Sequence, residues 1–140
     1  MNINPIKNGI VIDHITAGKA MRIYKLLDLD KLDCSVAIIK NVESGRMGKK
    51  DIVKIDSDYD IDIAVLGYID SGVTVNVIKN GEIIEKRAVE LPQKLTNVIF
   101  CKNPRCITTC EQELPHIFNL TDKENKVYRC LYCETKAKNL

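Results

Sequence analysis

The stretch Cys101-Lys-Asn-Pro-Arg-Cys106, separated by 23 residues from Cys130-Leu-Tyr-Cys133, decides how the C-terminal part of this chain folds. Two close cysteine pairs at such a spacing bring four thiolates to the corners of one tetrahedron, the ligand geometry of structural zinc, with Zn–S distances of about 2.3 Å. We therefore expect one Zn²⁺ ion per chain, held by these four cysteines. A closed four-sulfur site leaves no coordination position for water, so this metal is expected to hold structure and not to catalyse hydrolysis.

Two alternatives to the metal site are a pair of disulfides and four unrelated buried thiols. The chain begins without a cleavable apolar signal, which favours an intracellular, cytoplasmic protein, and disulfides are rare in that compartment. Cys110 and His116 lie close enough in sequence to compete for the metal, but neither is needed once four thiolates are in place. Cys34 stands in an apolar run and is interpreted as a small buried hydrophobe.

Length and composition favour two small domains in this chain of 140 residues. We predict an N-terminal domain at residues 1–92 and a C-terminal domain at 93–140, with Pro92 near the joint. The C-terminal part is short and has few large apolar residues, so it needs the metal to fold. The N-terminal part is rich in Ile and Val, enough for a core of its own.

The composition argues against two classes of partner. The formal net charge is only +2, with two Phe, five Tyr and no Trp, whereas a nucleic-acid binder usually shows a basic stripe and stacking aromatics. No apolar run approaches the ~20 residues of a membrane span. We therefore expect neither nucleic acid nor a membrane as a partner.

Hydrophobic periodicity predicts an α+β fold for the N-terminal domain. Strand patterns occur at residues 9–15, 34–39, 51–55 and 73–78 and from 82 onward, and helical spacing follows the first and third of them. Thr16 is the expected N-cap of the first helix. Asn80-Gly81 is a strong two-residue hairpin signal between the last two strands. The order is βαββαβ with an extra strand, typical of a ferredoxin-like sandwich with helices on one face, followed here by a small zinc-ribbon-like β domain.

Catalytic motifs are missing from the sequence. Gly45-Arg-Met-Gly48-Lys49-Lys50 superficially suggests a phosphate-binding loop, but its glycine spacing is wrong and a strand follows it. Asp58, Asp60 and Asp62 lack the glycine and the terminal glutamate of a calcium loop and stand at an expected helix start, where acidic residues are favourable. We expect no enzymatic activity.

One further stretch, Val11-Ile12-Asp13-His14-Ile15, lies at a strand-to-helix junction. Together with Gly45-Arg-Met-Gly48-Lys-Lys-Asp-Ile-Val-Lys54, Thr74-Val-Asn76 and the C-x-N-P-x-C…C-x-Y-C pattern, it closely resembles the regulatory chain of aspartate carbamoyltransferase. The resemblance runs in register from about Ile3 to Glu134. It implies a non-catalytic subunit whose N-terminal domain binds ATP, CTP and in some members UTP, while its zinc domain grips the catalytic chain.

The resemblance also implies which residues bind the nucleotide. Charged and polar positions would contact the phosphates and ribose, apolar positions would form the walls, and the N-terminal segment would bring backbone groups to the base. The implied nucleotide site comprises Ile3, Asn4, Ile6, Asp13, His14, Lys50, Ile52, Lys54, Asn76, Ile78, Ile83 and Lys86.

Strand parity supports most of this map but conflicts with Lys86. Residues 50, 52 and 54 alternate onto one face, as do 76 and 78. A regular hairpin that pairs Lys79 with Glu82 would place Ile83 on the face of Ile78 and turn Lys86 to the other side. We therefore expect a bulge near Ile84-Glu85 if Lys86 contacts the ligand.

Partner contacts are expected at both ends of the chain. Asn103, Arg105 and Glu134 flank the predicted metal ligands and would touch the catalytic chain. The N-terminal domain would pair sheet edge to sheet edge with a second regulatory chain. The rival interpretations are a zinc-ribbon nucleic-acid binder and a stand-alone nucleotide-sensing protein.

Overall fold

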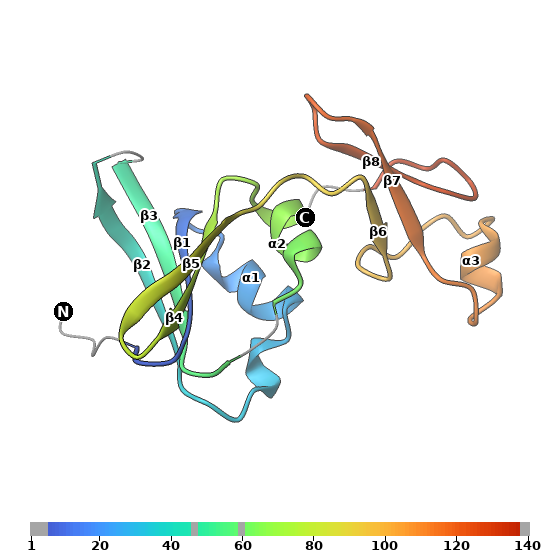
Figure 1. Cartoon of the computed structure of the whole chain (residues 1–140). Coiled ribbons are helices and arrows are strands. Elements are labelled where there is room, and N and C mark those ends of the chain that lie inside the picture. Colours follow the sequence, from blue (N-terminus) through green and yellow to red (C-terminus); the bar gives the residue numbers. More distant parts are fainter. Residues whose placement is uncertain (1–5, 46–47, 59–60, 138–140) are drawn as a thin grey trace. The chain divides into compact units, whose positions relative to one another are not determined.

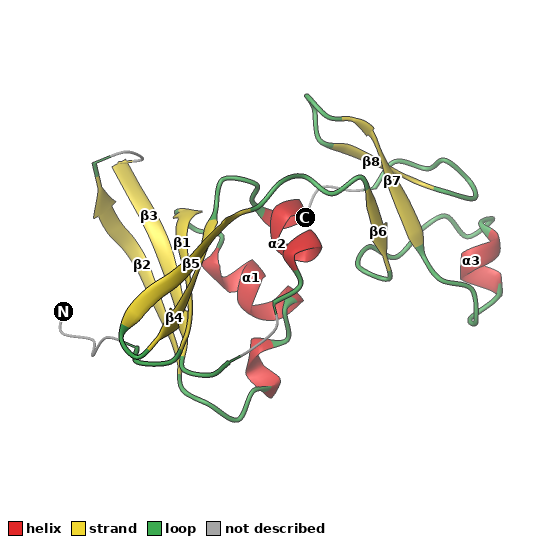
Figure 2. Cartoon of the chain, viewed as in Figure 1, coloured by secondary structure: helices red, strands yellow, loops and turns green. Residues whose placement is uncertain are grey.

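The computed structural model describes residues 6–45, 48–58 and 61–137, so the predicted site residues Ile3 and Asn4 lie outside the described part. The chain divides into two compact units, Met1–Glu90 and Leu91–Leu140. Each unit is built around its own sheet, shown in Figures 1 and 2. Pro92, expected near the joint, is the second residue of the second unit.

The first unit contains a five-stranded antiparallel sheet in the order β2-β3-β1-β4-β5. Its strands are β1 (Gly9–Thr16), β2 (Val36–Ser44), β3 (Gly48–Ile55), β4 (Thr74–Lys79) and β5 (Glu82–Ala88). Its helices are α1 (Ala20–Leu26), the 3-10 helix η1 (Leu29–Lys31) and α2 (Ile63–Ile69). The predicted α+β class and the βαββαβ order are confirmed, with the extra strand β5 beside β4 at one edge.

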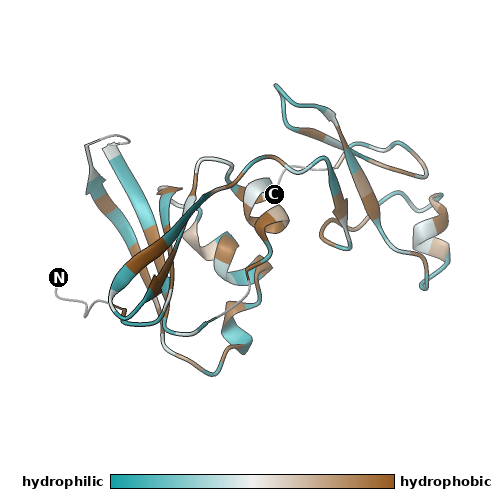
Figure 3. Ribbon diagram, in the orientation of Figure 1, coloured by the Kyte–Doolittle hydropathy of each residue, from teal (hydrophilic) through white to brown (hydrophobic). Residues whose placement is uncertain are grey.

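The core of the first unit lies on one side of its sheet. Helices α1 and α2 cover that side, and the largely apolar α2 is mostly brown in Figure 3. Alternate strand residues such as Ile12, Val53 and Val75 point toward the helices and are fully buried, together with Ile23 and Leu66 from the helices. The residues between them on β1, β3 and β4 are only half-buried, because in the described part of the chain no helix covers the other face. We call this second side the open face.

The expected N-cap at Thr16 is wrong. Thr16 is the last residue of β1, and α1 begins at Ala20, with Lys19 in the cap position and no side-chain cap. The fully buried Asp51 on β3 replaces the missing cap: its Oδ2 accepts hydrogen bonds from the N–H groups of Gly18 (2.9 Å) and Ala20 (3.3 Å). Its Oδ1 accepts a third bond, from Asn41 N–H on β2 (3.0 Å). A side chain distant in sequence therefore satisfies amides that helix starts leave unpaired.

The second helix follows the expected local rule. Asp62 is its N-cap, and its Oδ1 accepts bonds from the N–H groups of Ala64 (3.1 Å) and Val65 (3.3 Å). The expected acidic helix start is thus confirmed for Asp62 as a cap.

The second unit is a three-stranded antiparallel sheet in the order β6-β7-β8, with one short helix. The elements are β6 (Lys94–Thr96), α3 (Ile107–Cys110), β7 (Ile117–Asp122) and β8 (Val127–Cys130). Its apolar core is small: Leu95, Phe118 and Tyr128 are buried, and Tyr128 Oη donates to Pro92 O at 2.7 Å. Across the described ranges of both units, no helix has the length and apolarity needed to cross a membrane.

Candidate functional site

An irregularity in β1 places Asp13 and His14 beside each other on the open face. The pairing of β1 with β3 shifts between Ile12 and Ile15, and His14 has a φ of 59° in the left-handed region. His14 N–H donates to Asp13 Oδ1 at 2.6 Å, and His14 Nδ1 lies 3.2 Å from Thr74 Oγ1 on β4. The bulge therefore presents two consecutive polar side chains where a regular strand would present one.

Asp13 forms an ion pair with Lys50, the first of the predicted β3 lysines. Lys50 Nζ lies 2.9 Å from Asp13 Oδ1, and both side chains are largely buried, with 16% and 21% of their surface exposed. Burial raises the pKa of the Asp13 carboxyl, but hydrogen bonds from Lys50 and His14 N–H and the positive charge of Lys50 outweigh it, so the pKa is lowered. Asp13 is therefore an ionised acceptor, and part of the Lys50 charge is already neutralised.

The predicted bulge in β5 is present and brings Lys86 to the open face. Lys79 pairs with Glu82 and Ile78 with Ile83, but Val77 then pairs with Glu85, so Ile84 is the extra residue. Beyond this shift Lys86 lies opposite Asn76. Strand register thus confirms the face assigned to Lys86.

Four residues from four neighbouring strands form one transverse row on the open face. Lys54 on β3 pairs with Val11 on β1, Val11 pairs with Asn76 on β4, and Asn76 pairs with Lys86. Three strand spacings of ~4.8 Å separate the two lysine backbones by about 14 Å, so their long side chains can converge on one ligand above β1 and β4.

Three polar groups of this row have no protein partner in the part of the chain that the structure describes. Within the described residues, neither Lys54 nor Lys86 forms an ion pair. In the same part of the chain, Asn76 Oδ1 is buried without any hydrogen-bond partner. A buried acceptor without a partner is costly, and an anion or polar ligand on the open face would complete these groups.

One end of the open face is apolar. Gly9 on β1 pairs with Ile78, and Ile78 pairs with Ile83, whose side chain is 51% exposed. Gly9 has no room for a side chain, because an added Cβ would collide with the backbone oxygen of Ile55 and come within 2.9 Å of Ile6 Cγ2. Ile6 therefore packs beside Gly9 at this end. Ile52, between Lys50 and Lys54, is half-buried on the same face.

Two residues of this face were not predicted. Val11 lies at the centre of the row, between Lys54 and Asn76, and Thr74 contacts the His14 ring. The period-two alternation that placed Asn76 and Ile78 applies equally to Thr74, and that of β1 applies to Val11. The alternation of the sequence could therefore have predicted that Val11 and Thr74 lie on the open face. It could not have predicted that Thr74 contacts His14.

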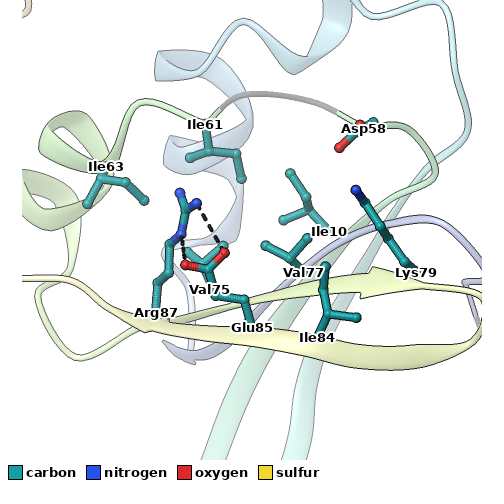
Figure 4. A pocket seen from close by; sticks show the side chains of 10 residues that line it. All are labelled: Ile10, Asp58, Ile61, Ile63, Val75, Val77, Lys79, Ile84, Glu85 and Arg87. Carbon is teal, nitrogen blue, oxygen red and sulfur yellow. Dashed lines mark hydrogen bonds and ion pairs between the residues drawn. The ribbon is translucent and has the colours of Figure 1, made fainter.

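A separate hollow lies on the helix side of β5. This pocket of about 370 Å³ has mixed apolar and charged walls, and its lining residues are Ile10, Asp58, Ile61, Ile63, Val75, Val77, Lys79, Ile84, Glu85 and Arg87. Figure 4 shows Glu85 and Arg87 pointing into it, joined by Arg87 Nε to Glu85 Oε1 (2.9 Å) and Arg87 Nη2 to Glu85 Oε2 (3.2 Å). Inward-pointing charges are a common protection of an edge strand against pairing with other chains. We therefore take the open face as the candidate site.

The second unit brings the four predicted cysteines together. The Sγ atoms of Cys101, Cys106, Cys130 and Cys133 all lie within 4.8 Å of one another. Cys101 and Cys133 are 3.6 Å apart, and so are Cys106 and Cys130. A tetrahedron with metal–sulfur bonds of about 2.3 Å has sulfur–sulfur edges of about 3.8 Å, so this donor set fits one metal ion. All six cysteines are free, which excludes the disulfide alternative in this structure.

Neighbouring polar groups support the cluster. Thr108 Oγ1 lies 3.0 Å from Cys106 Sγ, and Thr135 Oγ1 lies 3.1 Å from Cys133 Sγ. Burial raises the pKa of the Cys101 thiol to about 12. Burial also acts to raise the pKa of Cys133, but hydrogen bonds from Thr135 and Asn103 bring it down to about 6. Cys133 is thus more readily a thiolate than Cys101 before a metal binds.

Cys110 and His116 lie outside this cluster. Cys110 is exposed, and its Sγ lies 4.0 Å from Pro104 O. His116 Nδ1 accepts a hydrogen bond from Cys101 N–H at 3.0 Å, and its ring meets Phe100 edge-on at 5.0 Å. His116 therefore orients a ligand residue without being a ligand.

The predicted partner residues lie at the surface around the cluster. Arg105 and Glu134 are exposed, whereas Asn103 is half-buried, its Oδ1 accepting from Arg105 N–H (3.0 Å) and its Nδ2 donating to Thr135 Oγ1 (3.2 Å). Sequence reasoning missed the large apolar side chains beside the ligands. Phe100, Ile107, Leu131 and Tyr132 are 52%, 51%, 46% and 42% exposed. Each is adjacent to a cysteine ligand, so a rigid metal centre displays an apolar surface typical of protein–protein contacts.

Comparison with known proteins gives matches over nearly the whole chain. Residues 1–90 match the family model described as aspartate carbamoyltransferase regulatory chain, allosteric domain, and residues 93–139 match the metal binding domain of the same chain. Similar relatives carry the name aspartate carbamoyltransferase regulatory chain. The protein from Clostridium botulinum strain Hall is 54% identical over 96% of this chain and 92% of its own length. The proteins from Clostridium tetani and Bifidobacterium longum are 50% and 43% identical, covering 96% and 99% of this chain and 94% and 99% of their own lengths.

Proposed function

The chain belongs to the family of aspartate carbamoyltransferase regulatory chains, the non-catalytic subunits of that enzyme, and we propose that it binds nucleoside triphosphates on its open face. ATP, CTP and UTP compete for this one site. Their binding modulates the catalytic trimers that act in pyrimidine biosynthesis in the cytoplasm.

The observation that carries this proposal is the β5 bulge. It aligns Lys86 with Asn76, Val11 and Lys54 on one surface. Among the described residues, the two lysines have no ion-pair partner and the buried Asn76 Oδ1 has no donor. A nucleoside triphosphate carries about four negative charges. Charge-assisted bonds from lysines to phosphate are among the stronger hydrogen bonds in proteins.

The two ends of the open face suit the two ends of a nucleotide. The triphosphate lies over Lys86 and His14, whose Nδ1 is engaged by Thr74. Asp13 accepts a hydrogen bond from a ribose hydroxyl while Lys50 keeps it ionised. The base lies against Ile78 and Ile83, in a pocket where few polar groups fix orientation.

The metal domain would hold one Zn²⁺ ion on Cys101, Cys106, Cys130 and Cys133. This ion supplies structure only, because the four thiolates complete its coordination. The apolar side chains beside the ligands, with Asn103, Arg105 and Glu134, would then contact the catalytic chain. The allosteric domain would pair with that of a second regulatory chain through a sheet edge.

Reconstitution tests this proposal. The metal-loaded chain is mixed with catalytic trimers of aspartate carbamoyltransferase from the same source, and aspartate saturation is recorded with and without ATP or CTP. We expect a larger complex whose saturation curve moves with nucleotide, by a coupling of about 1–3 kcal/mol. A complex that ignores nucleotides would contradict the nucleotide site, and failure to form any complex would contradict the partner assignment.

A further inference from the structure

The turn at the tip of the β4–β5 hairpin is held from outside the hairpin. Asn80 and Gly81 have φ values of 54° and 79°, both left-handed, as a two-residue type I′ turn requires. In such a turn the N–H groups of the two central residues point away from the ladder and have no partner within the hairpin. Their hydrogen bonds must therefore go to water or to another segment.

Here both N–H groups bond to the segment that leads into β1. Asn80 N–H donates to Asn8 Oδ1 at 3.2 Å, and Gly81 N–H donates to Lys7 O at 2.9 Å. One contact uses a side chain and the other uses the backbone, so the segment and the turn are joined at two adjacent residues. Segments near a chain end are usually poorly ordered unless they are tied down in this way.

The same segment packs beside the apolar end of the open face. Ile6 Cγ2 lies 2.9 Å from the position of a Cβ added to Gly9, and Gly9 is in register with Ile78 and Ile83. The two hydrogen bonds therefore fix Ile6 relative to the hairpin that carries Ile83 and, beyond the bulge, Lys86.

We propose that Ile6–Asn8 and the turn Asn80–Gly81 form a latch that holds the base end of the nucleotide site, with Asn8 as its positioning residue. The inference rests on the proposed function and adds that different residues order the base end and the phosphate end of the site. The latch orders the surface on which the base lies and has no part in holding the phosphates. Ordering that surface before binding lowers the entropy cost of ligand binding.

The experiment compares Asn8→Leu with Asn8→Asp in the metal-loaded full chain. Leucine has nearly the size of asparagine but no acceptor, whereas aspartate retains an oxygen for Asn80 N–H. Dissociation constants for ATP, CTP and inorganic tripolyphosphate are measured by titration calorimetry. The readout is the ratio of nucleotide affinity to tripolyphosphate affinity, which cancels any general effect of the added aspartate charge.

We expect Asn8→Leu to lower this ratio by roughly fivefold, the scale of one modest hydrogen bond, and Asn8→Asp to restore it. Far-UV circular dichroism checks that both variants are folded. An unchanged ratio in Asn8→Leu would overturn the latch while leaving the proposed function intact. Wild-type chain that binds no nucleotide would overturn both proposals. Equal wild-type affinities for nucleotide and tripolyphosphate would overturn the latch alone.

Discussion

The sites of the two units differ in how they relate to the hydrophobic core. In the second unit the four cysteine sulfurs are both the site and a main part of the interior, since among its described residues only Leu95, Phe118 and Tyr128 provide a buried apolar core beside them. In the first unit a helix-covered core on one side of the sheet supports polar groups on the other side. From this difference we expect that the polar residues of the open face can be substituted without unfolding the first unit. Substituting the cysteines should unfold the second unit.

The largest effect should follow from breaking the cysteine cluster. We expect Cys106→Ser, or removal of the metal with a chelator, to unfold the second unit, because structural zinc contributes on the order of 10–16 kcal/mol in small domains. Amide NMR spectra should lose the dispersed signals of residues 91–140 and keep those of the first unit. Cys110→Ser, at an exposed cysteine outside the cluster, is the control and should change nothing. A folded second unit without metal would remove the contrast between the two units.

Asp51→Ala should destabilise the first unit and leave the second unit unchanged. Its carboxylate accepts three backbone hydrogen bonds, and each buried N–H left unpaired costs about 1–3 kcal/mol. We expect urea unfolding of the first unit to shift by about 3 kcal/mol or more, with the metal content unchanged. Asp56→Ala, at the exposed residue that follows β3, serves as control. Equal shifts in the two variants would show that Asp51 has no special role.

A substitution at Lys86 should weaken nucleotide binding without changing the stability of the fold. We expect Lys86→Ala to weaken ATP and CTP binding about 10- to 100-fold, since a hydrogen bond to a charged group contributes about 1.5–3 kcal/mol. The unfolding free energy should hardly change, because Lys86 is exposed. Lys79→Ala removes the same charge from the same hairpin, but that side chain faces the helix-side pocket. Similar losses of affinity in both variants would point to general electrostatics and against a site on the open face.

A smaller effect is expected at the surface of the metal domain. Tyr132→Ala should weaken assembly with catalytic trimers by about 1–2 kcal/mol, and Glu134→Gln by less, because exposed aromatic anchors usually outweigh peripheral charges. Native gel titration measures assembly, and metal analysis confirms that the ion is retained. Glu111→Gln, an exposed charge farther from the ligands, is the matched control. Assembly equal to wild type in Tyr132→Ala would exclude this surface.

The smallest effect concerns the ion pair between Asp13 and Lys50. The pKa of Asp13 in the folded chain is below its ordinary value of 3.8, so the carboxylate stabilises the fold above that pH. This contribution is lost as the pH falls from about 3.8 through the lowered pKa. The stability difference between wild type and Asp13→Asn should therefore be constant near neutral pH and vanish in acid. Asp28→Asn, which breaks an exposed pair with Lys31, should show no such trend.

Sequence patterns predicted features that depend on spacing along the chain. Cysteine spacing located the metal ligands, and Asn80-Gly81 fixed the hairpin register at Lys79 and Glu82. Alternation in a regular ladder would have placed Lys86 on the wrong face of the sheet. The bulge was expected only because of the resemblance to a known family.

The features that escaped prediction depend on residues distant in sequence. Thr16 looked like a helix cap, but Asp51 provides the hydrogen bonds from 33 residues away. The contact of Thr74 with His14 spans 60 residues and the bond from Asn80 to Asn8 spans 72. No local pattern encodes such pairings, since they arise only when the strands have been placed side by side.

The extra residue in β5 has a consequence for comparing relatives of different length. Removing Ile84 alone would leave Ile78 opposite Ile83 and Lys86 opposite Asn76, now in a regular ladder. Removing one β4 residue between Asn76 and Ile78 would instead change the register, so that Lys86 would no longer lie opposite its present partner. A relative shorter by one residue can thus keep its lysine on the open face, provided that the gap in its alignment falls at Ile84.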